Sequence, residues 1–477
     1  MKKLVCCGLS ALLSATMFGC SSSSGGSDGD KVELTFWGHQ NEPWAASYQE
    51  IAREFEKKNP DIHINFEFFP YDQFESKVQT SLISKEGGAD IYELWGGWGL
   101  DFASTGALAE IPENLSKTIH DDVYPSTIGA LEYEGKLYGL PMEFNIENGA
   151  MLVNKKLMSE HNLKTPTTWK ELRETAKKAT KKDGDTITIK GFDFVNWDSV
   201  PYMFLSMILS TGGTYQNEDG SFNLQTPQAK AALQELYDMV KVDGVTTMEG
   251  LDGGGDMEGY QQLYAGNVVM VPRGPWTIAE GTTSFGLEYG KDFDYVSMPW
   301  FGDKPAFAAE TGWSMAVNGN SKQQEAAFKF LEYFFQDDVL MKHNIACSQI
   351  PPKKSVASNP EFIKQMPYAE PLVKILDKSQ FIGHFNTDQF KEKVNATFQK
   401  LVRGDIKNVD QALITMEKEL KKNNASIGKR TSIFPNLKEG EPIEKQKIHS
   451  HRPDSNLSPS YDFYDWSHYR RSCDIIL

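Results

Sequence analysis

Two alternating hydrophobic patterns run through the N-terminal part of the chain. Residues 32–37 and 62–68 alternate apolar and polar positions, as strands do, and residues 89–94 form a short apolar run. Residues 48–55 and 74–82 place apolar side chains three and four positions apart, which predicts helices between these strands. The resulting β-α-β-α-β order predicts an α/β fold, with a mainly parallel sheet flanked by helices.

The same alternation of helix and strand patterns returns further along the chain. Thr168 and Glu171 have the spacing of a capping box, which predicts a helix that begins there. Further helices are predicted at 201–209 and 229–240, and buried or alternating strands at 268–272, 293–298 and 313–317. From about residue 436 the apolar periodicity ends, so 436–477 is predicted to be an irregular tail.

The net charge limits the classes of partner, and the first thirty residues indicate where in the cell the protein is located. The 477 residues carry a formal net charge of −16, which argues against a nucleic-acid partner. A basic start, an apolar run to Phe18 and then Gly19-Cys20 have the layout of a signal peptide over residues 1–19. Met17 to Cys20 is similar to a bacterial lipobox, which implies a lipid on Cys20, a flexible tether over 20–30 and an extracytoplasmic protein anchored to the cell membrane. An ordinary signal peptide is the alternative.

The cysteines fit export without crosslinks. Of the five cysteines, Cys6 and Cys7 would leave with the signal peptide, and Cys20, Cys347 and Cys473 remain. These form neither a disulfide framework nor a C-x-x-C metal pair, and we expect no metal and no cofactor.

Tryptophans in turns after strands are the main candidates for chemistry. The apolar run 89–94 leads into Trp95-Gly96-Gly97-Trp98, and ligands of open α/β sheets bind at such carboxyl ends. Sugars present apolar C–H faces that lie against aromatic rings. The pattern therefore predicts a carbohydrate site drawn from Trp37, Trp44, Trp95, Trp98, Trp197, Trp276 and Trp313. Trp169, next to the capping box, is assigned to the core instead.

Polar candidates for the sugar hydroxyls lie in the same turns and crossings. They are Gln40, Asn41, Glu42, Glu143, Asn145, Arg273 and Glu310. Arg273 leaves open an acidic sugar or a phosphorylated polyol, whereas the abundant tryptophan favours an uncharged sugar of more than one ring. Asp90 is expected to hold the backbone at its strand end and not to contact ligand.

The order of landmarks resembles the extracellular solute-binding proteins of bacterial ABC importers, in the group that binds sugars and oligosaccharides. The matching pieces include Leu34-Thr35-Phe36-Trp37, Gly87-Gly88-Ala89-Asp90-Ile91, Gly135-Lys136-Leu137-Tyr138-Gly139-Leu140-Pro141, Pro166-Thr167-Thr168-Trp169 and Gly274-Pro275-Trp276. The resemblance implies a two-lobed periplasmic-binding-protein-like fold with interleaved crossings, lobe 1 from 31–142 and 296–345, and lobe 2 from 143–295 and 346–435. It also implies hinge closure on a carbohydrate ligand and delivery to the membrane-spanning subunits of an ABC importer. We expect a monomer.

Enzyme signatures are absent from the sequence. It contains no G-x-S-x-G, H-E-x-x-H or G-x-x-x-x-G-K-[ST] segment. The alternative function is a secreted glycoside-active enzyme, in which Glu143 and Glu310 would serve as paired carboxylates in the same cleft. A binding protein is the favoured prediction.

Overall fold

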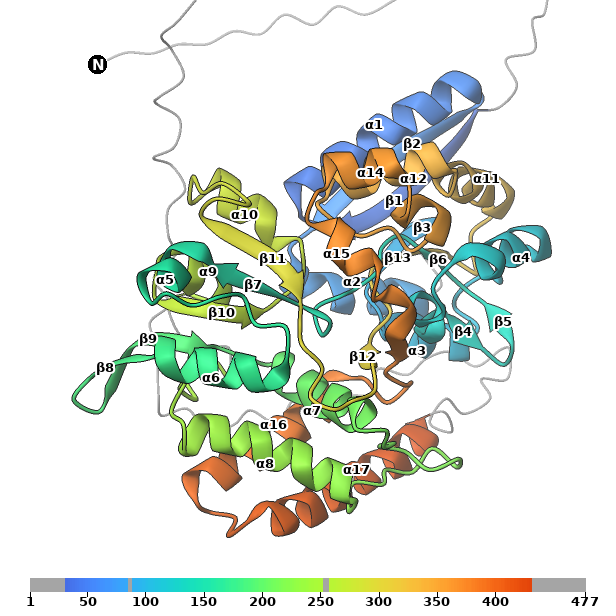
Figure 1. Cartoon of the computed structure of the whole chain (residues 1–477). Helices are drawn as coiled ribbons and strands as arrows, with labels where there is room; N and C mark the ends of the chain where they lie inside the picture. Colours follow the sequence, from blue (N-terminus) through green and yellow to red (C-terminus); the bar gives the residue numbers. More distant parts are fainter. Residues whose placement is uncertain (1–30, 85–87, 252–256, 431–477) are drawn as a thin grey trace, which may run out of the picture. The chain divides into compact units, whose positions relative to one another are not determined.

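The computed structural model describes residues 31–84, 88–251 and 257–430 (Figure 1). The predicted signal peptide, Cys20 with its predicted tether, and the predicted tail from 436 lie outside the described residues. Within them, two five-stranded sheets each carry their own flanking helices.

The first sheet contains the strands of the N-terminal pattern. Its order is β2-β1-β3-β13-β6. The strands are β1 (Val32–His39), β2 (Ile62–Phe69), β3 (Ile91–Leu94), β6 (Leu140–Pro141) and β13 (Ser314–Val317). Helices α1 (Glu42–Lys58), α2 (Tyr71–Ser84), α11 (Gln324–Phe334) and α12 (Asp337–Ala346) belong to this half. Its core includes Phe36, Tyr48 and Phe55, the apolar positions on which the strand and helix predictions rested.

The second sheet has the order β11-β7-β10-β9-β8. The strands are β7 (Ala150–Asn154), β8 (Lys181–Asp183), β9 (Thr186–Phe192), β10 (Val268–Pro272) and β11 (Phe293–Ser297). Figure 1 shows this sheet with α6 (Trp169–Ala179), α7 (Ser199–Ser210) and α8 (Pro227–Lys241). Helices α16 (Asp388–Arg403) and α17 (Val409–Arg430) pack against α8. Every residue of β7 and of β10 is buried, as the continuous apolar run 268–272 predicted.

Shorter elements connect these layers. The helices are α3 (Trp98–Ser104), α4 (Glu113–Asp122), α5 (Lys155–Glu160), α9 (Gly259–Tyr264), α10 (Thr277–Thr283), α13 (Lys354–Ala357), α14 (Pro360–Gln365) and α15 (Ala369–Val373). Three 3-10 turns are η1 (Pro125–Thr127), η2 (Gly129–Leu131) and η3 (Leu376–Lys378). The remaining strands are β4 (Glu132–Tyr133), β5 (Lys136–Leu137), β12 (Phe307–Ala309) and β14 (Ser379–Phe381).

Strand directions differ from the expected mainly parallel arrangement. β1 is parallel to β2 and β3, but β13 runs antiparallel to β3 and β6. In the second sheet only β9 and β10 are parallel, and β7, β8 and β11 pair antiparallel. A parallel pair needs a long crossover connection, whereas a strand that returns from the other half of the chain can enter antiparallel. Both sheets are therefore mixed, within the predicted α/β class.

A two-stranded ribbon stands apart from both sheets. β12 and β14 pair in parallel, and the residues beside them contact both halves of the molecule. The Ser126 and Ser379 hydroxyls lie 2.9 Å apart on the side of the first sheet, and the Tyr215 hydroxyl, after α7, donates to the Ile382 carbonyl at 2.9 Å. Glu310 directly follows β12, so the ribbon positions this carboxyl group between the two halves.

Candidate functional site

An aromatic cluster covers one edge of the first sheet. Because β13 is antiparallel to β3, Trp313 at its start lies beside the end of β3. The Trp313 ring stacks on His39 at 4.3 Å between centroids and contacts Trp95 at 5.2 Å. Trp98 and Trp44 follow at 6.0 Å and 6.1 Å. These five residues are called the aromatic hub below. Three of the predicted turns, after β1, after β3 and before β13, therefore meet at one place.

Buried hydrogen bonds hold this hub from beneath. The Glu93 carboxylate, fully buried on β3, contacts His39 Nδ1 at 2.8 Å and accepts from the Tyr48 hydroxyl at 2.7 Å. A ring held by a charge-assisted hydrogen bond keeps its orientation. Trp313, stacked on that ring, is only 8% exposed. Trp313 is therefore the covered centre of the hub.

A charged cluster occupies the matching edge of the second sheet. Arg273 follows β10, and its guanidinium lies 3.7 Å from a Glu147 carboxylate oxygen and 3.8 Å from one of Asp198. Glu258 also pairs with it. Burial lowers the pKa of Arg273, but the surrounding carboxylates outweigh it and hold that pKa above its ordinary value. The four residues, called the charged cluster below, leave Arg273 fully paired.

Trp276 lies beside the charged cluster. Its Nε1 donates to Glu147 at 2.9 Å, its ring meets Tyr260 edge-on at 5.2 Å, and the ring is 36% exposed. A Cβ on Gly274 would lie 2.7 Å from the Trp276 ring, so this close approach requires glycine. The turn thus holds an indole in a fixed orientation with a large open surface.

Glu310 lies between the two halves. Its carboxyl group accepts from the Tyr202 hydroxyl at 2.7 Å and the Asn386 amide at 2.8 Å, and Asn145 lies at 3.4 Å. Burial raises the pKa of Glu310 to about 7. The Lys391 ammonium pairs with Asp198 at 2.8 Å, which connects this group to the charged cluster.

Glu143 is buried at the first crossing. Its Oε1 accepts from the backbone amide of Trp313 at 3.0 Å, and burial raises the pKa of its carboxyl group to about 8. At neutral pH most of this group is protonated, so it is a hydrogen-bond donor as well as an acceptor. Glu143 therefore fixes the backbone that carries the aromatic hub.

Four further predicted residues lie outside these groups. Trp37 packs between Phe69 at 5.1 Å and Tyr92 at 5.8 Å. Gln40 is exposed in the turn between β1 and α1, and Glu42 is exposed as the first residue of α1. Trp197 is half-buried before Asp198, and its carbonyl accepts from Asn395 at 2.9 Å. Whether any candidate residue contacts ligand stays a prediction.

Two structural assignments from the sequence are confirmed. Asp90 accepts from the Thr35 amide at 2.9 Å and from the Ser321 hydroxyl, so it holds strand ends together. The capping box of Thr168 and Glu171 is present, and Trp169 is buried with its Nε1 donating to Glu235 at 2.9 Å.

Several residues of the site were not predicted. They are His39, Glu147, Asp198, Tyr202, Asn386 and Lys391. Glu147 precedes β7 and Asp198 follows β9, and neither strand was among those predicted from the sequence. Asn386 and Lys391 come from the start of α16, and no local pattern connects that helix to strands more than a hundred residues earlier.

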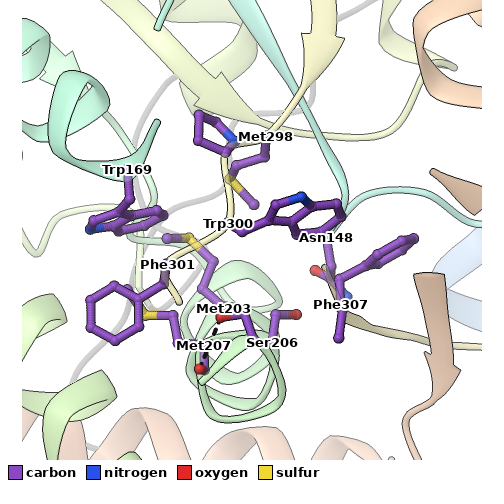
Figure 2. Close-up of a pocket in the computed structure, with 12 residues that line it drawn as sticks. Asn148, Trp169, Met203, Ser206, Met207, Met298, Trp300, Phe301 and Phe307 are labelled. Atoms are coloured by element: carbon purple, nitrogen blue, oxygen red, sulfur yellow. Dashed lines mark hydrogen bonds between the residues drawn. The ribbon is translucent and has the colours of Figure 1, made fainter. Parts of the chain in front are cut away.

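Two small hollows lie among the described residues. One, of about 220 Å³ including its open mouth, borders Glu310, Asn386 and Gly97 and adjoins the site. The other, of about 300 Å³, is shown in Figure 2, where Met203, Met207 and Met298 gather with Trp169 and other rings. Polar side chains at this hollow bond within the protein: the Ser206 hydroxyl accepts from the Ala308 backbone amide, and the Asn148 side-chain amide donates to the Ala308 carbonyl. Methionine fills irregular gaps in cores, so the second hollow is packing space.

Neither a metal site nor a membrane span is found within residues 31–430 as described. The search found no group of three or more His, Cys, Asp or Glu side chains that could hold an ion. The helices there are too short or too polar to cross a bilayer.

Comparison with known proteins decides the family. The model of the bacterial extracellular solute-binding protein family matches residues 40–341. The chain belongs to this family. It is 27% identical over 344 residues to an arabinooligosaccharide-binding protein of Bacillus subtilis, covering 70% of this chain and 76% of that one. It is 24% identical over 340 residues to a maltotriose-binding protein of Pyrococcus abyssi, covering 69% and 68%.

Solved structures of this kind share the fold of this solute-binding protein. The cyclic alpha-maltosyl-1,6-maltose binding protein of Arthrobacter globiformis matches with a TM-score of 0.69 at 21% identity, over 82% of this chain and 98% of that one. The sugar-binding protein MalE of Xanthomonas citri also gives 0.69, at 19% identity, over 83% and 99%. The two-lobed α/β fold is confirmed. As a member of the solute-binding protein family the chain is not an enzyme, and the glycoside-active alternative is set aside.

Proposed function

We propose that this chain is a lipid-anchored extracytoplasmic protein that captures an uncharged sugar or oligosaccharide between two lobes and delivers it to an ABC importer. The observation that carries the proposal is Trp276, an exposed indole fixed by the Glu147 carboxylate beside the Arg273 guanidinium. An open ring face beside oriented polar groups is what a sugar ring requires. The names of the relatives, maltotriose- and arabinooligosaccharide-binding proteins, point to the same class of ligand.

The charges of the site favour an uncharged ligand over an acidic one. Arg273 is surrounded by Glu147, Asp198 and Glu258, and Lys391 is paired with Asp198. An anionic sugar would have to displace a carboxylate from a buried cation, which leaves a charge unpaired. The acidic sugar or phosphorylated polyol that Arg273 left open is therefore not proposed.

A screen by thermal shift tests the ligand class. Mono-, di- and oligosaccharides, including maltotriose and arabino-oligosaccharides, are compared with uronic acids and sugar phosphates. An uncharged sugar at 100 Kd adds about 2.7 kcal/mol to stability and raises the melting temperature. A shift produced by the acidic sugars and by none of the neutral ones would contradict the proposal.

The lobes would close on the ligand about the crossings between the sheets. We keep the proposed limits of 31–142 with 296–345 for lobe 1 and 143–295 with 346–435 for lobe 2. Ligand-driven hinge closure lets an importer distinguish loaded from empty protein, because the ligand shifts the population toward the closed form. We also propose that the protein acts as a monomer, which sedimentation at micromolar concentration tests; a stable dimer would contradict it.

The anchor rests on the sequence Gly19-Cys20 after an apolar run. In Cys20→Ser the sulfur that would carry the lipid is absent, so the protein should leave the membrane fraction. Unchanged fractionation of this variant, together with an unmodified N-terminus in the wild type by mass spectrometry, would show that Cys20 carries no lipid.

A further inference from the structure

Few large apolar side chains are exposed among the described residues, and two of them are aromatic. Trp276 is one, and Tyr71, with 55% of its surface exposed, is the other. An isolated exposed apolar residue needs no explanation by itself. Tyr71 is not isolated, and its position in the fold indicates a role.

Tyr71 lies at the same sheet edge as the aromatic hub. It is the first residue of α2, directly after β2 ends at Phe69. Because β2 and β3 both run parallel to β1, their carboxyl ends meet at one edge of the sheet. The Tyr71 ring lies 6.1 Å from that of Trp313 and 6.4 Å from that of Trp98. Tyr71 is thus the exposed outer member of a cluster whose centre is covered.

The first turn of α2 faces charges of the other half. Trp98, 6.4 Å from the Tyr71 ring, follows Gly97, where an added Cβ would lie 2.9 Å from the Asn386 carbonyl oxygen just before α16. Lys391 of α16 pairs with Asp198 of the charged cluster at 2.8 Å. The exposed Tyr71 ring therefore faces the start of α16 and the charged cluster. The part of the chain that the structure describes provides no hydrogen-bond partner for its hydroxyl.

We propose that Tyr71 is a further ligand-binding residue, a platform for one sugar ring on the wall opposite Trp276. This inference rests on the proposed function. The apolar face of the ring would stack on Tyr71, while its hydroxyls would reach the Lys391–Asp198 pair. Since Tyr71 and Trp276 belong to different halves, the ligand must present two apolar faces, as an oligosaccharide does.

Calorimetric titration with maltotriose, or with the neutral sugar that gives the largest thermal shift, tests this role in the full-length protein. Tyr71→Ala should weaken binding about tenfold or more, because an open stacking surface is lost. Tyr71→Phe keeps the ring and should keep most of the affinity. Ile83→Ala is the matched control, since Ile83 is an exposed apolar residue at the other end of the same helix. The ligand-free melting temperatures of all three variants should match that of the wild type.

The outcomes separate this inference from the proposed function. Wild-type affinity in Tyr71→Ala would overturn the role of Tyr71 and leave the function standing. A large fall in the ligand-free melting temperature of Tyr71→Ala, or an equal loss of affinity in Tyr71→Phe, would also overturn the stacking role. If the wild type binds no sugar of the panel while it melts cooperatively, the proposed function itself fails.

Discussion

At the scale of single residues, Trp276 and Trp313 show how the same side chain serves two purposes. Both follow a glycine-containing turn, and the sequence treats them alike. The structure separates them, since Trp276 presents an open face and Trp313 is enclosed by five other rings. Periodicity and turn signals locate a strand end, but burial there depends on residues that arrive from distant parts of the chain.

Trp276→Ala should therefore weaken ligand binding with little effect on folding. Roughly 100 Å² of ring surface is available, which at ~25 cal/mol/Å² corresponds to about 2.5 kcal/mol, nearly a hundredfold in affinity. Titration calorimetry and ligand-free melting are compared in the same variant. Retained affinity with a fall of ~3–5 kcal/mol in folding stability would instead make Trp276 a core residue.

Glu143 predicts a pH dependence of stability. Its folded pKa of about 8 lies above that of the unfolded chain, so the native state binds more protons between about pH 4.5 and pH 8. Stability should accordingly fall as pH rises through that window, and the cost is complete above pH 8. Between pH 5 and pH 8 the free energy of unfolding should fall by about 3 kcal/mol less in Glu143→Gln than in the wild type, as the size of the Glu143 pKa shift indicates.

Urea unfolding at several pH values measures this difference, with Glu171→Gln as a control because Glu171 is an exposed carboxylate in a capping box. A pH profile of Glu143→Gln parallel to that of the wild type would contradict a protonated, buried Glu143.

At the scale of elements, the strand-to-turn units explain what could be predicted. The apolar patterns located β1, β2, β3 and β10 and the turns after β1, β3 and β10, because each strand has a local signature. Strand direction has no such signature, so the antiparallel entry of β13 and β7 was missed. The turn after β2 was overlooked because Tyr71 begins a helix and was assigned to none of the candidate turns.

The turn between β3 and α3 also sets how closely the halves approach. A Cβ on Gly97 would lie 2.9 Å from the Asn386 carbonyl oxygen, at the segment that leads into α16. Overpacking of this kind costs about 1–3 kcal/mol. Gly97→Ala should therefore hinder the approach of the two halves and lower ligand affinity about tenfold, while ligand-free melting changes little.

Ser104→Ala is the control at the other end of α3, where the Ser104 hydroxyl donates to Asp101 of the same helix. Identical affinities for Gly97→Ala and the wild type would mean that this contact does not limit closure.

At the scale of the whole molecule, the interleaved chain explains why one site draws on so many segments. Along the chain, β13 of the first sheet comes after all the strands of the second sheet, β7 to β11. The ribbon of β12 and β14 brings Glu310 and the Asn386 segment between the two halves. The sequence resemblance implied the two-lobed fold that the solved structures confirm. It did not anticipate that Arg273 would be paired with three carboxylates, because a net charge of −16 says nothing about where those carboxylates lie.

The central claim is that a sugar is captured between two halves that close on it. Small-angle X-ray scattering of the purified protein, with and without a saturating neutral oligosaccharide from the thermal-shift screen, measures this directly. The account predicts a smaller radius of gyration with the sugar, and no change with a sugar that gives no thermal shift. Identical scattering profiles with and without a sugar that demonstrably binds would contradict capture by closure.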